Sequence, residues 1–278
     1  MGSFLFLALV AAAGVVWSCT TTRTPCIEFL DRTEAAEVFG SNAFWYLSLY
    51  RHAESVAKGG GLVNTDAHDF QQQMLLANSR CHDWKPSEIE VVQQTIREHR
   101  ALQRAKWRLI KADDRVDFSY PYTIGDCVVL PANMLAAAGS SENRLSLAKT
   151  LLHEHVHIFQ RQHPGLFDTL YNAWGFRRAT RIDIPADHKE RTVTNPDGLD
   201  AWVFSCPDGT FTMGLFLEGG KPVKKAFRVS GPDQKGAYVA VGDPIELREI
   251  SQWLFGIEGC YHPHEVHAYL VSESAFGQ

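Results

Sequence analysis

Residues 150–157 read Thr-Leu-Leu-His-Glu-His-Val-His, and this stretch carries the pattern that decides the fold. His153 and His157 stand at positions i and i+4, so on a helix their imidazoles project from one face, one turn apart. Glu154 lies about 100° around the helix from His153. Two imidazoles that share a face can hold Zn²⁺, and an adjacent carboxylate can take a proton from water bound there. We predict His153 and His157 as metal ligands and Glu154 as a catalytic base.

The flanking sequence predicts that this motif lies on a long helix. Residues 143–162 contain neither Pro nor Gly, and their apolar side chains recur at helical spacing. Ser140 or Ser141 can cap the start of the helix, and Pro164 follows its end.

His155 lies inside the motif but receives a different interpretation. It points about 200° away from His153, toward the side of the helix that carries Leu151, Leu152 and Phe159. We predict a core histidine that is hydrogen-bonded to a neighbour, and we do not count it as a ligand.

The H-E-x-x-H motif resembles that of the zincin metallopeptidases, in which a third residue completes the metal site. One candidate is His163, because residues 153–163 match the spacing of the metzincin pattern H-E-x-x-H-x-x-G-x-x-H. Gln160 replaces the glycine whose backbone freedom breaks the helix in that pattern. Without the break, His163 would lie on the far face of a continuing helix. Met213, which could serve as the methionine of a Met-turn, falls in a strand-like run.

The second candidate is Glu265, which would fall in the first turn of a helix opened by Pro263. This resembles the gluzincin arrangement, where a downstream helix supplies a glutamate ligand and a small residue, here Ala268, follows it. Gluzincins of the thermolysin kind have asparagine before the glutamate and an acidic residue four positions after it, whereas this chain has His264 and Tyr269. The resemblance implies Glu265 as the third ligand and leaves unidentified the carboxylate that would orient a zinc histidine.

Two points about this site stay open. Glu265 has a simpler explanation, since a first-turn glutamate also interacts favourably with the helix macrodipole. A donor for the oxyanion formed during hydrolysis is expected as well. Tyr171, Tyr261 and His264 are candidates, and the sequence does not choose between them.

Composition bounds the class of protein and its partners. The chain has 278 residues, enough for one large domain or two small ones. Its net charge of −5 and the absence of a long basic run argue against nucleic acid as a partner. The resemblance instead implies a peptide or protein substrate.

Residues 4–17 form an uncharged, mostly apolar run. Its length suits the core of a signal peptide and is short for a membrane span, although no Lys or Arg precedes it. Cys19 follows small residues and resembles an imperfect bacterial lipoprotein cleavage site. We expect residues 1–18 to be a signal peptide or N-terminal anchor and residues 19–30 a short tether. The protein would then be secreted or attached to a membrane through its N-terminus.

Six cysteines occur without a C-x-x-C pair, so a cysteine-based zinc cluster is unsupported. In an oxidising compartment some of them could form disulfides. Their connectivity cannot be read from the sequence.

The remaining pattern predicts an α+β fold. Helical patterns precede the motif, and the third of them is opened by a capping box at Ser87. Strand-like runs lie just before the motif and again in a β-meander, with helices between and after them. The expected helices are 33–58, 66–79, 87–105, 166–174, 244–255 and 263–274, and the expected strands are 107–111, 122–130 and the meander 201–229.

By resemblance, the expected architecture is zincin-like: N-terminal helices, a small sheet beside the metal helix, a β-meander insertion and C-terminal helices. Residues 31–278 would form a single two-lobed catalytic domain, with residues 125–130 as the edge strand that holds an extended substrate. The predicted function is zinc-dependent peptide hydrolysis. The alternatives are a non-catalytic exported binding protein on the same scaffold and a zinc hydrolase of a non-peptide bond.

Overall fold

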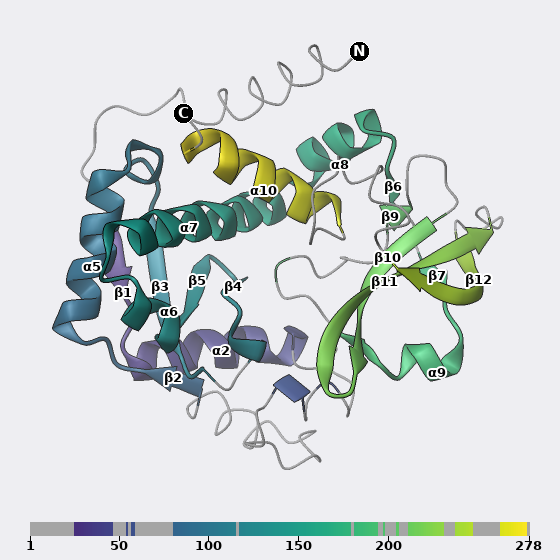
Figure 1. Cartoon of the computed structure of the whole chain (residues 1–278), viewed down its shortest axis with the longest axis horizontal. Helices are drawn as coiled ribbons and strands as arrows, with labels where there is room; N and C mark the ends of the chain where they lie inside the picture. Colours follow the sequence, from purple (N-terminus) through teal and green to yellow (C-terminus); the bar gives the residue numbers. More distant parts are fainter. Residues whose placement is uncertain are drawn as a thin grey trace.

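The fold combines helices with two small β-sheets (Figure 1), so the α+β class expected from the sequence is confirmed. No helix in the part of the chain that is described is long and apolar enough to cross a membrane. Residues 1–18, expected to be a signal peptide or anchor, and the expected helix 66–79 lie outside this part. The computed structural model describes residues 25–46, 54, 57–58, 80–114, 117–178, 181–193, 197, 204–205, 211–230, 237–246 and 262–276.

The first sheet has five strands in the order β1-β3-β5-β4, and β2 pairs with the far end of β3. Strands β1, β3 and β5 run parallel, whereas β4 is antiparallel to β5. Strand β5 lies between β3 and β4, so β5 is in the interior of the sheet and β4 is at its edge. The strands are β1 (Ile27–Phe29), β2 (Cys81–His82), β3 (Trp107–Ala112), β4 (Tyr122–Ile124) and β5 (Cys127–Pro131).

The edge strand expected at residues 125–130 is therefore wrong. The sequence 122–130 reads as one continuous strand, but Gly125 adopts a positive φ of 58° and turns the chain. Ile124 and Cys127 pair across this tight turn, and the second half of the run becomes the interior strand β5. Glycine allows the turn because it has no Cβ to clash at positive φ.

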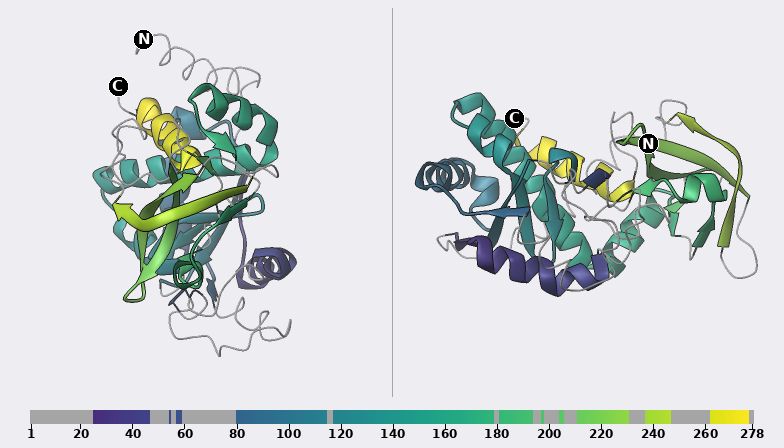
Figure 2. Two further views of the ribbon diagram at one scale, coloured as in Figure 1. Left: turned by 90° about the vertical axis from the view of Figure 1, so that its right-hand side faces the viewer. Right: turned by 90° about the horizontal axis from the view of Figure 1, so that it is seen from below.

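Helices cover both faces of this sheet (Figures 1 and 2). Helix α2 (Arg32–Tyr46) lies on one face. Helices α5 (Pro86–Glu98), α6 (Ala132–Ala137) and α7 (Ser141–Gln162) lie on the other. The predicted helix 33–58 is thus seen up to Tyr46, and most of its remainder lies outside the described residues.

Alternation along the strands divides the core between the two faces. Leu109 and Val128 pack with α5 and α7, while Ile110 and Val129 point the other way and pack with α2. Parallel strands that are buried on both faces read as continuous apolar runs, as β5 does. This two-sided burial anchors the sheet on which α7 rests.

The start of α5 differs from the predicted capping box. The helix begins at Pro86, where proline is favoured because its missing N–H is not needed. The Glu88 carboxylate accepts a hydrogen bond from the Lys85 N–H at 2.8 Å, so Ser87 is inside the helix and is not the cap. The helix ends at Glu98, and a 3₁₀ turn, η2, follows at Arg100–Leu102.

Three of the cysteines lie in the described part, and they are free. Cys26 is exposed, whereas Cys81 and Cys127 are buried against α2. Burial raises the pKa of both buried thiols to about 12. Unreactive thiols of this kind act as small apolar side chains in the core.

Two further helices complete the layer around α7. Helix α8 (Pro164–Ala173) follows directly after His163, as the sequence predicts for residues 166–174. Helix α10 (Pro263–Phe276) comes from the end of the chain and packs along α7 (Figure 1). The predicted helix 263–274 is confirmed.

The second sheet lies to one side of the first and its helices (Figure 2). Its core is an antiparallel meander of β10, β11 and β12, and Gly219 and Gly220 turn between β10 and β11 with positive φ. Strands β10 and β11 agree with the meander predicted at 201–229, whereas β12 lies beyond the predicted range. The meander strands are β10 (Phe211–Glu218), β11 (Lys221–Ser230) and β12 (Ala237–Glu246). The short strands β6 (Arg177–Arg178), β7 (Arg181–Asp183), β8 (Thr192–Val193) and β9 (Phe204–Ser205) complete the sheet. Helix α9 (Ala186–Lys189) lies between β7 and β8 in the chain.

The helix expected at 244–255 is wrong where it can be compared, because β12 continues to Glu246. Pro244 suggested the first turn of a helix. It lies instead where the register between β11 and β12 shifts, next to Gly242 with φ of 75°. Proline is tolerated at such an irregularity because no ladder hydrogen bond is required of it. Residues 247–255 lie outside the described part.

Candidate metal centre

Helix α7 carries His153 and His157 on one face. Its start is stabilised by Ser140, whose Oγ accepts the Asn143 N–H at 3.2 Å, as one of the two expected caps. Its apolar side is buried in the main core, which fixes the rotation of the helix about its axis. The two imidazoles therefore project from a helix that is held at its start and along its length.

Helix α10 carries Glu265 in its first turn. His262 is the N-cap: its carbonyl accepts the Val266 N–H at 3.0 Å, and its Nδ1 accepts the His264 N–H at 3.1 Å. Pro263 follows at the first helical position, where its fixed φ suits the helix. This capped first turn holds Glu265 facing α7.

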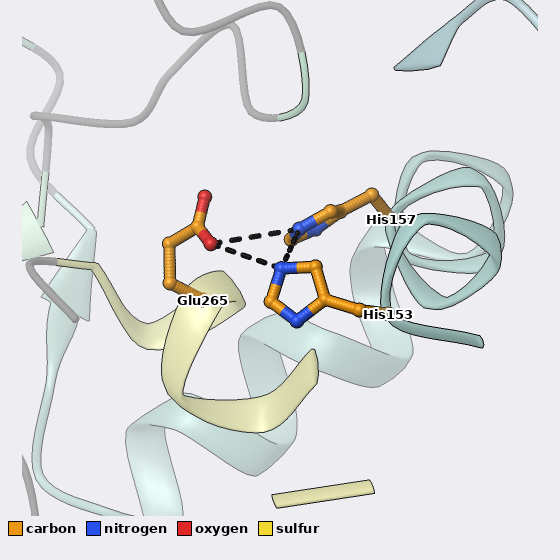
Figure 3. Close-up of side chains that lie close together, drawn as sticks. All are labelled: His153, His157 and Glu265. Atoms are coloured by element: carbon orange, nitrogen blue, oxygen red, sulfur yellow. Dashed lines mark hydrogen bonds and ion pairs between the residues drawn. The ribbon is translucent and has the colours of Figure 1, made fainter. Parts of the chain in front are cut away.

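The three predicted ligands meet (Figure 3). His153 Nε2 lies 3.0 Å from His157 Nε2 and 3.2 Å from Glu265 Oε2. His157 Nε2 lies 3.6 Å from the same oxygen. Ligand atoms about 2.0–2.1 Å from a tetrahedral zinc ion are about 3.3 Å from one another. The spacing and the donor types therefore fit one zinc ion.

Exposure differs among the three side chains. His157 is fully buried, whereas His153 and Glu265 keep 23% and 17% of their side-chain surface exposed. The buried His157 thus lies on the interior side of the site, and solvent reaches the site from the side of His153 and Glu265. This matches the need of a catalytic site for an open coordination position.

Electrostatics at His157 favour positive charge. Burial works to lower the pKa of His157, but the negative charges of Glu265, Asp197 and Glu154 outweigh it and raise that pKa to about 10. Burial alone would raise the pKa of Glu265, yet the neighbouring His157 and His153 hold it well below its usual range. Three carboxylates around one imidazole provide the negative environment that a divalent cation prefers.

Glu154 is buried beside these ligands, with 3% of its surface exposed. Its Oε2 has no hydrogen-bond partner among the described residues. Burial and the charge of Asp197 raise the pKa of Glu154 well above its usual value. A buried polar atom without a partner requires an explanation, and a bound ion or water next to the histidines would satisfy it.

Asp197 is a functional candidate that the sequence did not reveal. Its Oδ1 accepts both the N–H and the Oγ–H of Thr123, at 2.6 Å each. Arg161 of α7 donates to Thr123 Oγ1 at 2.7 Å, to the Asp197 carbonyl at 2.9 Å and to the Gly125 carbonyl at 2.8 Å. This network ties the edge strand β4 to α7.

Asp197 also reaches the metal centre. Ligand atoms of Glu154, His157 and Asp197 all lie within 4.8 Å of one another, as a second group of potential ligands that shares His157. In the sequence, the surrounding Asn-Pro-Asp-Gly run signals a turn and nothing more. No local pattern could have placed this carboxylate opposite the H-E-x-x-H helix.

Gln160 is a second residue with contacts that the sequence analysis did not anticipate. Its Oε1 accepts the His157 Nδ1–H at 2.8 Å, and its Nε2 donates to the His264 carbonyl at 3.0 Å. His267 Nδ1 lies 3.3 Å from the same Nε2. The partner of His157 Nδ1, expected to be a carboxylate, is therefore an amide. Its position three residues after His157 on one helix face is the signal that could have found it.

The metzincin alternative does not match the structure. Helix α7 continues through Gln160 to Gln162 without a break. His163 is the exposed residue at the C-cap, and its ring lies against Phe159 with centroids 4.3 Å apart. Met213 lies within strand β10 and not in a turn. Among the described residues, His163 belongs to neither group of potential ligands.

His155 is a core histidine, as predicted, although its expected hydrogen bond is not seen. Its ring lies 5.0 Å from that of Trp107 in β3, and burial lowers its pKa to about 4. Its Nδ1 has no hydrogen-bond partner among the described residues. It points away from the ligands.

Of the three candidates for the oxyanion donor, two lie among the described residues. Tyr171 of α8 is buried, with its ring 5.1 Å from that of His264, and burial together with the charge of Glu265 raises its pKa well above the usual value. His264 packs between Tyr171 and His262, and burial and neighbouring histidines lower its pKa. Tyr261 lies outside the described residues. Tyr171 is thus held as a neutral hydroxyl near the metal ligands.

Comparisons with protein-family models, with curated proteins and with solved structures give no match. The likeness to zincins is confined to the H-E-x-x-H motif and the downstream glutamate. The chemistry of the centre therefore follows from its own residues.

Proposed function

We propose that this protein is a zinc-dependent metallopeptidase of gluzincin-like type on a zincin-like fold. His153, His157 and Glu265 would hold one zinc ion, and Glu154 would be the general base. The observation that carries the proposal is the convergence of His153 and Glu265, which are 112 residues apart in the sequence, at 3.2 Å. The buried Glu154 Oε2, which has no hydrogen-bond partner among the described residues, supports it as well, because a hydrolytic zinc site needs such a base beside its ligands.

Bound zinc would supply a Lewis acid that polarises a carbonyl group and lowers the pKa of water to about 7. Side chains of the protein would carry out the remaining steps. Glu154 lies beside His157 with one oxygen available, so it would accept the proton of the attacking water and return it to the leaving amine.

Tyr171 supports the proposal as a donor to the developing oxyanion. Its hydroxyl stays protonated because burial and the charge of Glu265 raise its pKa. A buried neutral hydroxyl can donate a strong hydrogen bond to negative charge in a site that excludes water.

Substrate binding along the edge strand would be restricted. Extended peptides bind exposed strand edges through backbone hydrogen bonds. In β4, however, the Thr123 N–H already donates to Asp197. A peptide on this edge would have to use backbone groups other than that of Thr123 or displace Asp197.

The proposed substrate is a peptide or a protein, which the motif implies. The proposed location is secreted or membrane-attached through residues 1–18 or Cys19, which the apolar N-terminal sequence implies. A zinc hydrolase of a non-peptide bond would use the same centre. A non-catalytic binding protein is disfavoured, because such a protein has no chemical need for the Glu154 carboxylate.

The decisive experiment compares the full chain with its Glu154→Gln variant. Both should contain about one zinc per chain, because Glu154 is not one of the three ligands. Only the unmodified protein should hydrolyse a peptide library, read by mass spectrometry. Zinc without hydrolysis in either protein would favour the binding protein. Unmodified protein that folds without zinc when zinc is supplied would refute the proposal.

A further inference from the structure

Gln160 stands between the two helices that carry the ligands. Its side chain is buried, with 1% of its surface exposed. On one side it contacts His157 Nδ1, and on the other it contacts the His264 carbonyl and His267 Nδ1, both of helix α10. Beside the direct contact of His153 with Glu265, Gln160 therefore links a ligand candidate on α7 to the backbone of the first turn of α10.

The direction of these hydrogen bonds is determined by chemistry. A backbone carbonyl can only accept, so the atom of Gln160 that faces the His264 carbonyl is the Nε2 amide. The other end of the side chain is then Oε1, which can only accept. His157 Nδ1 must therefore carry the proton, which leaves His157 Nε2 as the atom available to a metal.

His267 agrees with this direction. Its Nδ1 faces the same donating Nε2 and must accept, so its ring is neutral. The ring is buried against Phe167 and Trp174.

We propose that Gln160 is a positioning residue that couples the docking of α10 to the metal-binding form of His157. When α10 is docked, the His264 carbonyl orients the amide, and the amide oxygen holds the proton of His157 on Nδ1 and the ring in place. Helix α10, which brings Glu265 to the site, thereby also fixes the proton of His157 on Nδ1 and the orientation of its ring. This inference rests on the proposed metal site.

An amide suits this position better than the carboxylate that commonly orients a zinc histidine. Glu154, Asp197 and Glu265 already surround His157 with negative charge. A further buried carboxylate would add repulsion, and it could not donate to the His264 carbonyl. The choice of Gln at the position where metzincins have Gly thus has a chemical reason in this chain.

The test compares Gln160→Met, which keeps the length of the side chain but removes both polar atoms, with Gln162→Met on the exposed end of the same helix. Zinc affinity is measured by competition with a chelator. Loss of the partner of a metal-bound histidine weakens metal binding by about 10- to 100-fold. We expect that loss in Gln160→Met and an unchanged affinity in Gln162→Met.

A second measurement needs no variant. In the zinc-loaded protein, ¹H–¹⁵N spectra should show His157 with a proton on Nδ1 that exchanges slowly with solvent, and Gln160→Met should make it exchange fast. A wild-type His157 protonated on Nε2, or equal zinc affinity in wild type and Gln160→Met, would overturn the inference while leaving the zinc site intact. Failure of the wild-type protein to bind zinc would instead refute the proposed function, and this inference with it.

Discussion

The two helices that meet at the metal centre are stabilised in different ways. Helix α7 has its own N-cap in Ser140, and its apolar side is buried against the first sheet. Helix α10 is capped by His262, and its first turn is held in place by the hydrogen bond from Gln160 of α7. The position of the two histidines is thus a property of one docked helix. The position of Glu265 depends on contact between helices.

The largest effect should come from removing the ligand on α10. Glu265→Ala deletes a charged oxygen ligand and should abolish stoichiometric zinc binding and hydrolysis. Helix α7 should remain folded, as judged by circular dichroism. His163→Ala is the matched control, because His163 is exposed at the end of α7 and should leave zinc content unchanged. If Glu265→Ala still bound zinc tightly, α10 would not supply a ligand, and the position of Glu265 would not matter for the metal site.

The second effect concerns the packing that orients α7. Leu151 is fully buried in the main core, so Leu151→Ala should lower the free energy of unfolding by about 2–5 kcal/mol. Leu145 lies on the same helix but is 38% exposed, and Leu145→Ala should cost about 0.5 kcal/mol or less. Urea denaturation measures both. Equal losses would mean that α7 is not oriented by its buried side.

A third change tests the link between α7 and the edge strand. Thr123→Val removes the hydroxyl that bridges Asp197 and Arg161 inside the protein. Buried polar groups that lose a partner cost about 1–3 kcal/mol, and we expect a loss of unfolding free energy in that range. Thr123→Ser keeps the hydroxyl and should cost less. If Thr123→Val were as stable as Thr123→Ser, the network would contribute nothing to holding α7.

The smallest effect should come from the cap of α7. Ser140→Ala removes the acceptor of the Asn143 N–H and should cost about 1 kcal/mol of unfolding free energy. Ser141 is the neighbouring residue, and its replacement by Ala should change stability by only a few tenths of a kcal/mol, because it is not the cap. A larger loss of unfolding free energy in Ser141→Ala than in Ser140→Ala would mean that Ser141, and not Ser140, caps the start of α7.

These two helices also show what could be predicted. The spacing of His153 and His157, the absence of Pro and Gly around them and the serine before them predict α7 well, because helix periodicity and capping are local. The position of Glu265 was anticipated through resemblance, since no local pattern joins residues 112 positions apart. The strands predicted at 122–130 are present as β4 and β5, but the edge position expected for 125–130 is wrong, because the turn at Gly125 folds the run into a hairpin and places β5 inside the sheet.

By itself, then, the sequence determined a helix with two histidines and a glutamate on known faces, and a second helix that starts at Pro263. Only the tertiary structure decided which carboxylate the histidines face, that Asp197 occupies the edge of β4, and that Gln160 contacts His157. The reason is physical. Periodicity and caps depend on residues within a few positions, whereas the partners of buried polar groups are set by the packing of distant segments, which must satisfy every buried donor and acceptor at once.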